Sequence, residues 1–265
     1  MAFQPLCGWL ISGCRSATQY ALAAMVLFFA LGVPAQTTNA LSDLQIRGRQ
    51  LAQQLLEQRP AENFTNTGVL QIRDGKGKRS EIPVRCKVVV TATNWQTGYF
   101  AGNSVENAGG VVVVHVDGQP NAYFPNGGNP NPANWPPQKL KAAELMDPLV
   151  PSCDFWICDL GLEFLHWPGQ NILRGETMRG VFCKVLESTN PNPPTNGYSR
   201  VVTWIDNESL GIVQAKAYDA KGNLLKDFYP NDVKKVNGQW QVGSMEIYNV
   251  QTRSRTTLEF DLKAK

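Results

Sequence analysis

The chain has 265 residues, of which 43% are hydrophobic and 18% charged, and a formal net charge of +3. These values are typical of a globular protein that buries a core, and they exclude a disordered or fibrous chain. The small net charge, without any long run of like charges, argues against nucleic acid as a partner.

Residues 1–35 have the pattern of a secretory signal peptide. Residues 20–35 are almost entirely apolar, follow Arg15 and end in small side chains, as signal peptidase requires. About 15 apolar residues are fewer than the roughly 20 of a membrane-spanning helix, although an uncleaved N-terminal anchor is the alternative. We predict cleavage after Ala35 or Ala40, and a single mature domain of residues 36–265 outside the cytoplasm.

A lipid anchor at Cys14 is not expected. The sequence Ile11-Ser12-Gly13-Cys14 has the small residues that precede a lipid-modified cysteine in bacterial lipoprotein signals. Such a cysteine follows the apolar run of its signal, whereas Cys14 precedes it. The sequence therefore predicts a protein that is not tethered through Cys14.

Residues 42–58 are predicted to form an amphipathic helix. Leucines at 41, 44, 51, 55 and 56 share one face, Ser42 and Gln45 have the spacing of a capping box, and Pro60 ends the element. A helix with one apolar face must pack on another element.

The next elements read as strands. Residues 69–73 and 82–90 flank a turn at 74–77 and alternate between apolar and polar side chains, which predicts an antiparallel hairpin. Pro83 predicts an edge or a bulge at the start of the second strand. Strands are also expected at 97–101, 110–116 and 122–124, then a Pro/Asn-rich loop at 125–137 and short helices at 139–146 and 159–167.

The remainder of the chain is predicted to be a meander. Turn residues, of which Asn237-Gly238 is the strongest signal, separate short strand-like runs. These runs are 181–186, 198–205, 211–218, 224–229, 233–236, 239–247 and 255–262. Tight turns make such strands antiparallel neighbours. The expected fold is α+β and mainly β: a single curved antiparallel sheet of eight to eleven strands, a half-open barrel with helices packed over its concave face.

The cysteines after residue 35 permit disulfides. An even number in an oxidising compartment allows two bonds in three connectivities. The candidates are Cys86, Cys153, Cys158 and Cys183. A zinc site is the competing interpretation, but no second close pair accompanies Cys153 and Cys158, and His115 and His166 lie in unrelated contexts. We expect no metal or other cofactor.

Catalytic motifs are scarce. Neither histidine accompanies a Ser or Cys in a nucleophile motif, and the sequence has no phosphate-binding glycine loop. A hydrolase would need two carboxylates facing each other across a cleft, and spacing alone does not place them so. The carboxylates considered are Asp154, Asp159, Glu163, Glu246 and Glu259. We expect a protein that is not an enzyme.

Large apolar side chains are the more informative feature. On a curved sheet they would either fill the core or line a cavity for an apolar ligand, and composition leaves both possibilities open. The candidates for lining a lipid cavity are Trp95, Phe100, Trp156, Phe164, Trp167, Trp204, Trp240 and Met245.

Several sequence blocks resemble the outer membrane lipoprotein-sorting proteins of the LolA/LolB group. The blocks are FWICDLGLEFLHWP (155–168), GVFCKVLES (180–188), YSRVVTWID (198–206), AYDAKGNLLKDF (217–228), KKVNGQWQVGSMEIYN (234–249) and RSRTTLEF (253–260). The resemblance covers roughly residues 140–265, and the first half matches more loosely. Cys153, Cys158 and the loop at 125–137 depart from the family's pattern.

The resemblance implies a monomeric periplasmic carrier whose apolar interior binds the acyl chains of a lipoprotein or lipid. It also implies sorting partners at the inner and outer membranes. The alternative is a structural or interaction module of the cell envelope, built on the same sheet with a filled core. Fold resemblance alone does not decide between these functions.

Overall fold

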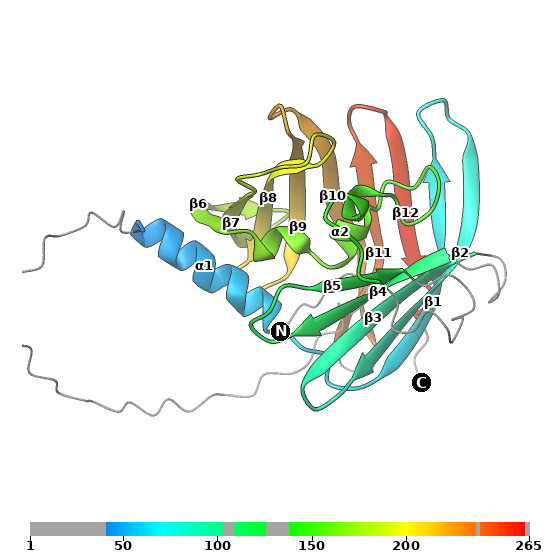
Figure 1. Ribbon diagram of the computed structural model, residues 1–265, viewed down its shortest axis with the longest axis horizontal. Helices are drawn as coiled ribbons and strands as arrows, with labels where there is room; N and C mark the ends of the chain where they lie inside the picture. Colours follow the sequence, from blue (N-terminus) through cyan, green and yellow to red (C-terminus); the bar gives the residue numbers. More distant parts are fainter. Residues whose placement is uncertain (1–40, 103–108, 126–137, 237–238, 263–265) are drawn as a thin grey trace, which may run out of the picture.

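All the strands of the described residues belong to one open antiparallel sheet (Figure 1). The computed structural model describes residues 41–102, 109–125, 138–236 and 239–262. The sheet has twelve strands in the order β5-β4-β3-β2-β1-β12-β11-β10-β9-β8-β7-β6. The predicted mainly β fold with a single antiparallel sheet is confirmed, and the strand count is one above the expected range.

The strand bounds follow the predicted pattern closely. The strands are β1 (Phe64–Arg73), β2 (Arg79–Val90), β3 (Asn94–Ala101), β4 (Gly109–Val116), β5 (Ala122–Pro125), β6 (Gly169–Met178), β7 (Val181–Thr189), β8 (Tyr198–Asp206), β9 (Ile212–Asp219), β10 (Leu224–Val236), β11 (Gln239–Asn249) and β12 (Ser254–Phe260). The structure differs from the prediction at two strands. The expected strands at 224–229 and 233–236 form one strand, β10, with register shifts between Pro230 and Val233. The strand β6 was not predicted.

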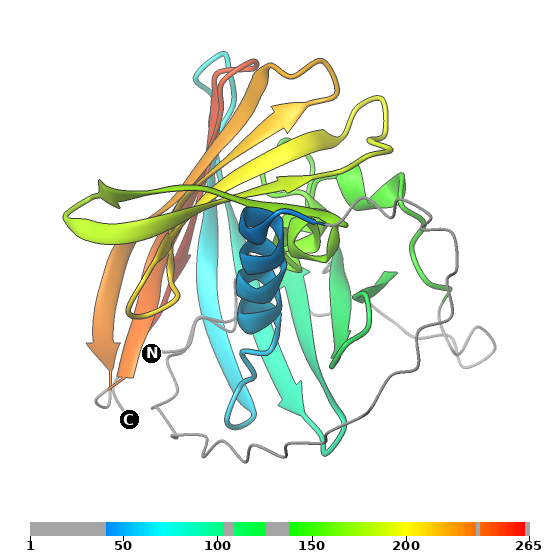
Figure 2. The same ribbon diagram turned by 90° about the vertical axis from the view of Figure 1, so that its left-hand side faces the viewer.

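The first and last strands pair in the middle of the sheet. β1 pairs with β12, with Leu70 opposite Leu258, so that a meander of β1–β5 and a meander of β6–β12 continue each other. β5 and β6 are consequently the two edges of the sheet. The segment between them must cross from one edge to the other, and it does so on the inner side of the curved sheet (Figure 2).

This crossing segment, residues 139–168, is called the lid below. It contains η2 (Glu144–Met146), α2 (Ile157–Leu160) and η3 (Glu163–His166). The expected helix at 159–167 is broken, because Leu162 lies in the left-handed region at φ 50° and no α-helix continues through such a residue. The expected helix at 139–146 is reduced to the single turn η2.

The predicted N-terminal helix is confirmed as α1 (Asp43–Leu56), with a complete capping box between Ser42 and Gln45. Gly48 allows close contact with the sheet edge: a Cβ there would lie 2.7 Å from the backbone of Gln170 and Asn171 on β6. The buried face begins at Gly48 and includes Leu51 and Leu55, whereas leucines 41 and 44 are exposed. α1 therefore closes the open side of the curved sheet next to β6 (Figure 2).

Pro83 lies at a point where one side of β2 has no neighbouring strand among the described residues, which agrees with the edge position predicted for it. It lies within β2 opposite Val69, but β3 ends at Ala101, which pairs with Val84, so no strand faces the missing N–H of the proline.

Three predictions concern residues outside the described part of the chain. These are the signal peptide and Cys14, nearly all of the loop at 125–137, and the turn at Asn237-Gly238. Within the described residues, none of the helices is both long enough and apolar enough to cross a membrane.

Candidate functional site

A small cavity lies between the lid and the concave face of β8–β11. Its volume is about 40 Å³, room for a few water molecules and far less than an acyl chain needs. The lining is mostly apolar and consists of Asp159, Leu162, Phe164, Tyr198, Val201, Ile212, Ala215, Ala217, Lys226, Phe228 and Ile247.

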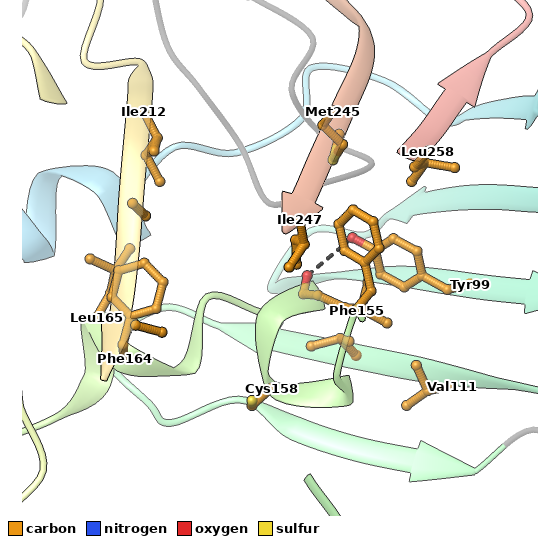
Figure 3. Close-up of a cluster of buried hydrophobic side chains, with 14 of the residues drawn as sticks. Tyr99, Val111, Phe155, Cys158, Phe164, Leu165, Ile212, Met245, Ile247 and Leu258 are labelled. Atoms are coloured by element: carbon orange, nitrogen blue, oxygen red, sulfur yellow. Dashed lines mark hydrogen bonds between the residues drawn. The ribbon is translucent and has the colours of Figure 1, made fainter. Parts of the chain in front are cut away.

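The cavity exists because the sheet residues beneath the lid are small at this point. Ala215 and Ala217 alternate along β9 and direct only methyl groups inward. Under β1–β5 the inward side chains are larger. Tyr99 of β3 is completely buried there against the lid, as is Phe155 of the lid, in the cluster drawn in Figure 3. The interior is thus filled under one half of the sheet and hollow under the other.

A larger and more polar groove, of about 550 Å³, opens on the other side of η3. It runs between α1, the β4–β5 turn and the end of the lid. Its lining residues are Arg49, Ala52, Gln53, Leu56, Glu57, Trp95, His115, Val116, Asp117, Gly118, Gln119, Pro120, Asn121, Leu165, His166, Trp167, Pro168 and Gln170. Phe164 lines the cavity and the adjacent Leu165 lines the groove, so η3 forms the partition between the two spaces.

Polar side chains of the sheet hold the lid at several points. Tyr99 donates a hydrogen bond to the carbonyl oxygen of Leu160 (3.1 Å), the dashed line of Figure 3. Asn121 donates to the carbonyl of Gly161 (2.8 Å), and Tyr123 donates to Glu163 (2.8 Å). The lid is therefore fixed by specific contacts as well as by burial of its apolar side chains.

A second set of polar contacts fixes the beginning of α2. The carboxylate of Asp154 accepts hydrogen bonds from Ser254 (2.6 Å) and Thr256 (2.9 Å) on β12. Burial raises the pKa of Asp154, and the two hydroxyl groups partly offset this effect. Thr256 also accepts the backbone N–H of Asp154 (2.9 Å), so both the side chain and the backbone of this lid residue are tied to β12.

A buried ion pair connects the lid to the floor of the cavity. The Nζ atom of Lys226, on β10, lies 3.3 Å from Oδ2 of Asp159 on α2. Asp159 also accepts the hydroxyl of Tyr198 (2.9 Å) and the backbone N–H of Trp156 (2.8 Å). Burial lowers the pKa of Lys226, and Asp159 opposes this shift. Removing one partner of such a pair typically costs about 3–5 kcal/mol.

Two neutral histidines line the groove. The ring of His115 stacks on Trp95 with centroids 3.6 Å apart. Burial lowers the pKa of His115 to about 3 and that of His166 to about 4. Within the described residues, the Nε2 atoms of both are buried and have no hydrogen-bond partner.

Five of the eight predicted cavity residues lie in the interior or line the groove. Phe164 lines the cavity, while Trp156 and Met245 pack in the same interior. Trp95 and Trp167 line the groove.

Phe100 and Trp204 do not face the interior. Phe100 follows the inward-facing Tyr99, and its ring lies 5.2 Å from the guanidinium of Arg85 on the outer face. Trp204 packs on the outer face with Cys183, Val185 and Val202, and its indole N–H donates to Glu176. The side chain of Trp240 lies outside the described part of the structure.

Cys86 is disulfide-bonded, but not to any of the other three candidate cysteines. Cys153, Cys158 and Cys183 are free, buried thiols, and Cys183 lies in the outer cluster, away from the lid. Burial raises the pKa of Cys153 to about 12 and that of Cys158 well above its usual value. These lid thiols are therefore unreactive at neutral pH.

Lys226 and Tyr198, the sheet side chains that donate hydrogen bonds to Asp159, were not predicted as site residues from the sequence. A lysine in a strand is ordinarily a solvent-facing residue. The available signal was the alternation along β10, which places Lys226 on the same face as the apolar Phe228. A register shift between Leu224 and Lys226 sets that face, and the sequence does not reveal it.

The fold defines the class of protein to which the chain is similar. A DUF1329 family protein from Desulfovibrio piger has 18% identity and a TM-score of 0.64, over 83% of this chain and 92% of that protein. A domain from Vibrio parahaemolyticus, described as an outer membrane lipoprotein-sorting domain, has 18% identity and a TM-score of 0.65, over 82% and 92%. A LolA superfamily protein from Nitrosomonas europaea has 14% identity and a TM-score of 0.57, over 83% and 93%.

Known sequences give less information about this chain than the solved structures do. A protein family described only as "Uncharacterized protein" matches residues 132–263, and no curated protein matches the chain. At these identities the solved structures establish the fold alone. The resemblance to the LolA group that the sequence blocks indicated is thus confirmed as a shared fold.

Proposed function

We propose that the protein is a carrier, without enzymatic activity, that binds an acyl chain of a lipoprotein or lipid beneath the lid. The observation that carries this proposal is the partition at η3. Phe164 and Leu165 separate an apolar cavity from a groove of about 550 Å³, and displacement of this one turn would join them. The joined space would have the size of known ligand pockets, which is about 300–1,000 Å³.

Energetics make this displacement feasible. Each buried methylene contributes about 0.8 kcal/mol, so eight to ten methylenes provide about 6–8 kcal/mol against the cost of moving the lid. The lid itself is bound to the sheet by discrete hydrogen bonds rather than by strand pairing. Net affinities in the micromolar range, near −8 kcal/mol, are about the upper limit for one such chain.

The proposed setting is the periplasm. It is supported by residues 1–35, which have the pattern of a signal peptide, and by the fold, which is shared with a domain described as lipoprotein-sorting. Sorting partners at the two membranes would deliver and receive the ligand. A protein without enzymatic activity is supported by the unreactive lid thiols and by the low pKa values of His115 and His166, which make both imidazoles weak bases at neutral pH.

Titration with a fluorescent fatty acid, followed by native mass spectrometry of the loaded protein, tests the proposal. We expect wild-type protein to bind the probe, and Phe164→Ala, which thins the partition, to bind it several-fold more tightly. Trp204→Ala is the matched control, because its aromatic ring lies on the outer face. If neither wild-type protein nor Phe164→Ala takes up the probe, the carrier proposal is wrong.

The small cavity favours a second candidate function, an interaction module of the cell envelope with a filled interior. A volume of about 40 Å³ in the closed structure is what such a module would retain. Under this alternative, Phe164→Ala destabilises the protein without producing any acyl-chain uptake.

A further inference from the structure

The cavity has an apolar lining with a single ion pair at its edge. Of the described residues that line it, only Lys226 and Asp159 are charged. Lys226 extends from the sheet and has 2% of its surface exposed, whereas Asp159 extends from the lid. A cation in such a position requires an anion or another strong partner, because an unpaired buried charge is very unfavourable.

Lys226 packs against two aromatic rings, that of Trp156 on the lid and that of Tyr198 on the sheet. Its Nζ lies 3.5 Å from the ring centroid of Trp156 and 5.2 Å from that of Tyr198. Tyr198 belongs to β8 of the sheet, so it remains beside Lys226 whatever the lid does. Movement of α2 would remove the carboxylate of Asp159 and leave an ammonium group and a phenol hydroxyl facing the space that the lid vacates.

We propose that Lys226 and Tyr198 bind the carboxylate of a long-chain fatty acid, which takes the position of Asp159 when the lid opens. This inference rests on the carrier function proposed above and specifies the ligand class. Asp159 itself shows that a carboxylate fits there: it accepts hydrogen bonds from Nζ of Lys226 at 3.3 Å and from the Tyr198 hydroxyl at 2.9 Å. A charge-assisted bond of this kind is stronger than a neutral one.

The acyl chain would then extend over the apolar floor of the cavity. Ala215 and Ala217 leave room for it, and Ile212 and Ile247 flank them. An acyl chain linked through an ester or an amide has no anion to offer Lys226. The site therefore selects a free fatty acid over the neutral acylated end of a lipoprotein.

The ligand carboxylate and Asp159 would compete for the same two donors, Lys226 and Tyr198. Since Asp159 is the anion that the ligand replaces, Asp159→Asn removes the competitor while keeping the shape of the side chain. We expect this variant to bind palmitate more tightly than the wild type, a gain that a damaged fold would not produce.

The test compares palmitate with hexadecanol, which has the same chain and no charge, in displacement titrations on the full chain. We expect wild-type protein to prefer palmitate at least tenfold, and Lys226→Met to lose this preference. Lys216→Met is the matched control, because Lys216 lies on the neighbouring strand β9 and pairs with Asp227 on the outer face. The double variant Asp159→Asn/Lys226→Met leaves no unpaired charge and should bind both probes equally.

The outcomes separate this inference from the carrier function. Equal binding of palmitate and hexadecanol by the wild type, or a retained preference in Lys226→Met, overturns the carboxylate site and leaves the carrier standing. Binding of neither probe by any variant overturns both. Tighter binding of lysophosphatidic acid than of palmitate by wild-type protein would also reject the carboxylate, in favour of a phosphate ligand.

Discussion

The two halves of the interior are built differently under the same lid. Beneath β1–β5 the concave face carries large side chains, and Tyr99 and Tyr123 of the sheet are fully buried together with Phe155 of the lid. Beneath β8–β11 it carries Ala215 and Ala217 and leaves a cavity with an ion pair at its edge. Both halves come from one continuous sheet, so side-chain size rather than topology determines where a ligand can be accommodated.

This contrast assigns separate tasks to the two halves. The filled half anchors the lid through the Tyr99, Asn121 and Tyr123 hydrogen bonds, and the hollow half provides the space. The family match at residues 132–263 spans the lid and the hollow half, but not β1–β5. We therefore expect mutations in the filled half to act on stability and mutations in the hollow half to act on binding.

The largest expected decrease in stability comes from replacing Phe155 with alanine. Its ring has no exposed surface, and Phe→Ala substitutions at such sites typically cost about 3–5 kcal/mol. Urea unfolding of Phe155→Ala should show a loss in this range. Phe228→Ala, at a half-buried position beside the cavity, should show a clearly smaller loss. Equal losses would mean that the two halves are packed alike.

His115 and His166 should make the folded protein less stable at acidic pH. Their pKa values in the folded protein, about 3 for His115 and about 4 for His166, lie below the unfolded value of about 6.5. As the pH falls below 6.5, the unfolded chain binds protons that the folded chain does not, so the free energy of unfolding decreases. Between pH 7 and pH 5 each histidine should contribute about 2 kcal/mol to this decrease.

Urea unfolding at the two pH values checks this prediction. In His115→Gln the decrease between pH 7 and pH 5 should be smaller than in the wild type by about 2 kcal/mol, and His166→Gln should behave similarly. A decrease unchanged from that of the wild type would show that the folded protein already accommodates the protonated imidazole.

Most of the fold was predictable because strand signals are local. Alternation and turn residues predicted eleven of the described strands, at least in part, and the Ser42–Gln45 capping box placed α1. β6 was missed because it is an edge strand, paired on one side only and with Gln170 as its one buried residue, and its sequence has little alternation. The break at Leu162 was also hidden, since nothing in its type indicates a positive φ.

The site was less predictable because it depends on which face each side chain occupies. An aromatic residue is equally apolar on either face, and only register separates the inward Tyr99 from the outward Phe100. Trp204 was misplaced for the same reason. Lys226 and Asp159 meet from elements 67 residues apart, a pairing that no local pattern contains.

The smallest expected change in stability, and the sharpest test of the hollow half, is Ala215→Val. The two added carbons occupy much of a cavity of about 40 Å³, and a hydrophobic substitution that the site can accommodate costs less than about 1.5 kcal/mol. Uptake of the fluorescent fatty acid should nevertheless fall at least tenfold, because the chain and the new methyl groups need the same space. Lys216→Val, at the next position and on the outer face, is the control and should leave uptake unchanged. Undiminished uptake by Ala215→Val would place the acyl chain outside this cavity, most directly in the groove beside α1, and would transfer the binding role from the hollow half to the end of the filled one.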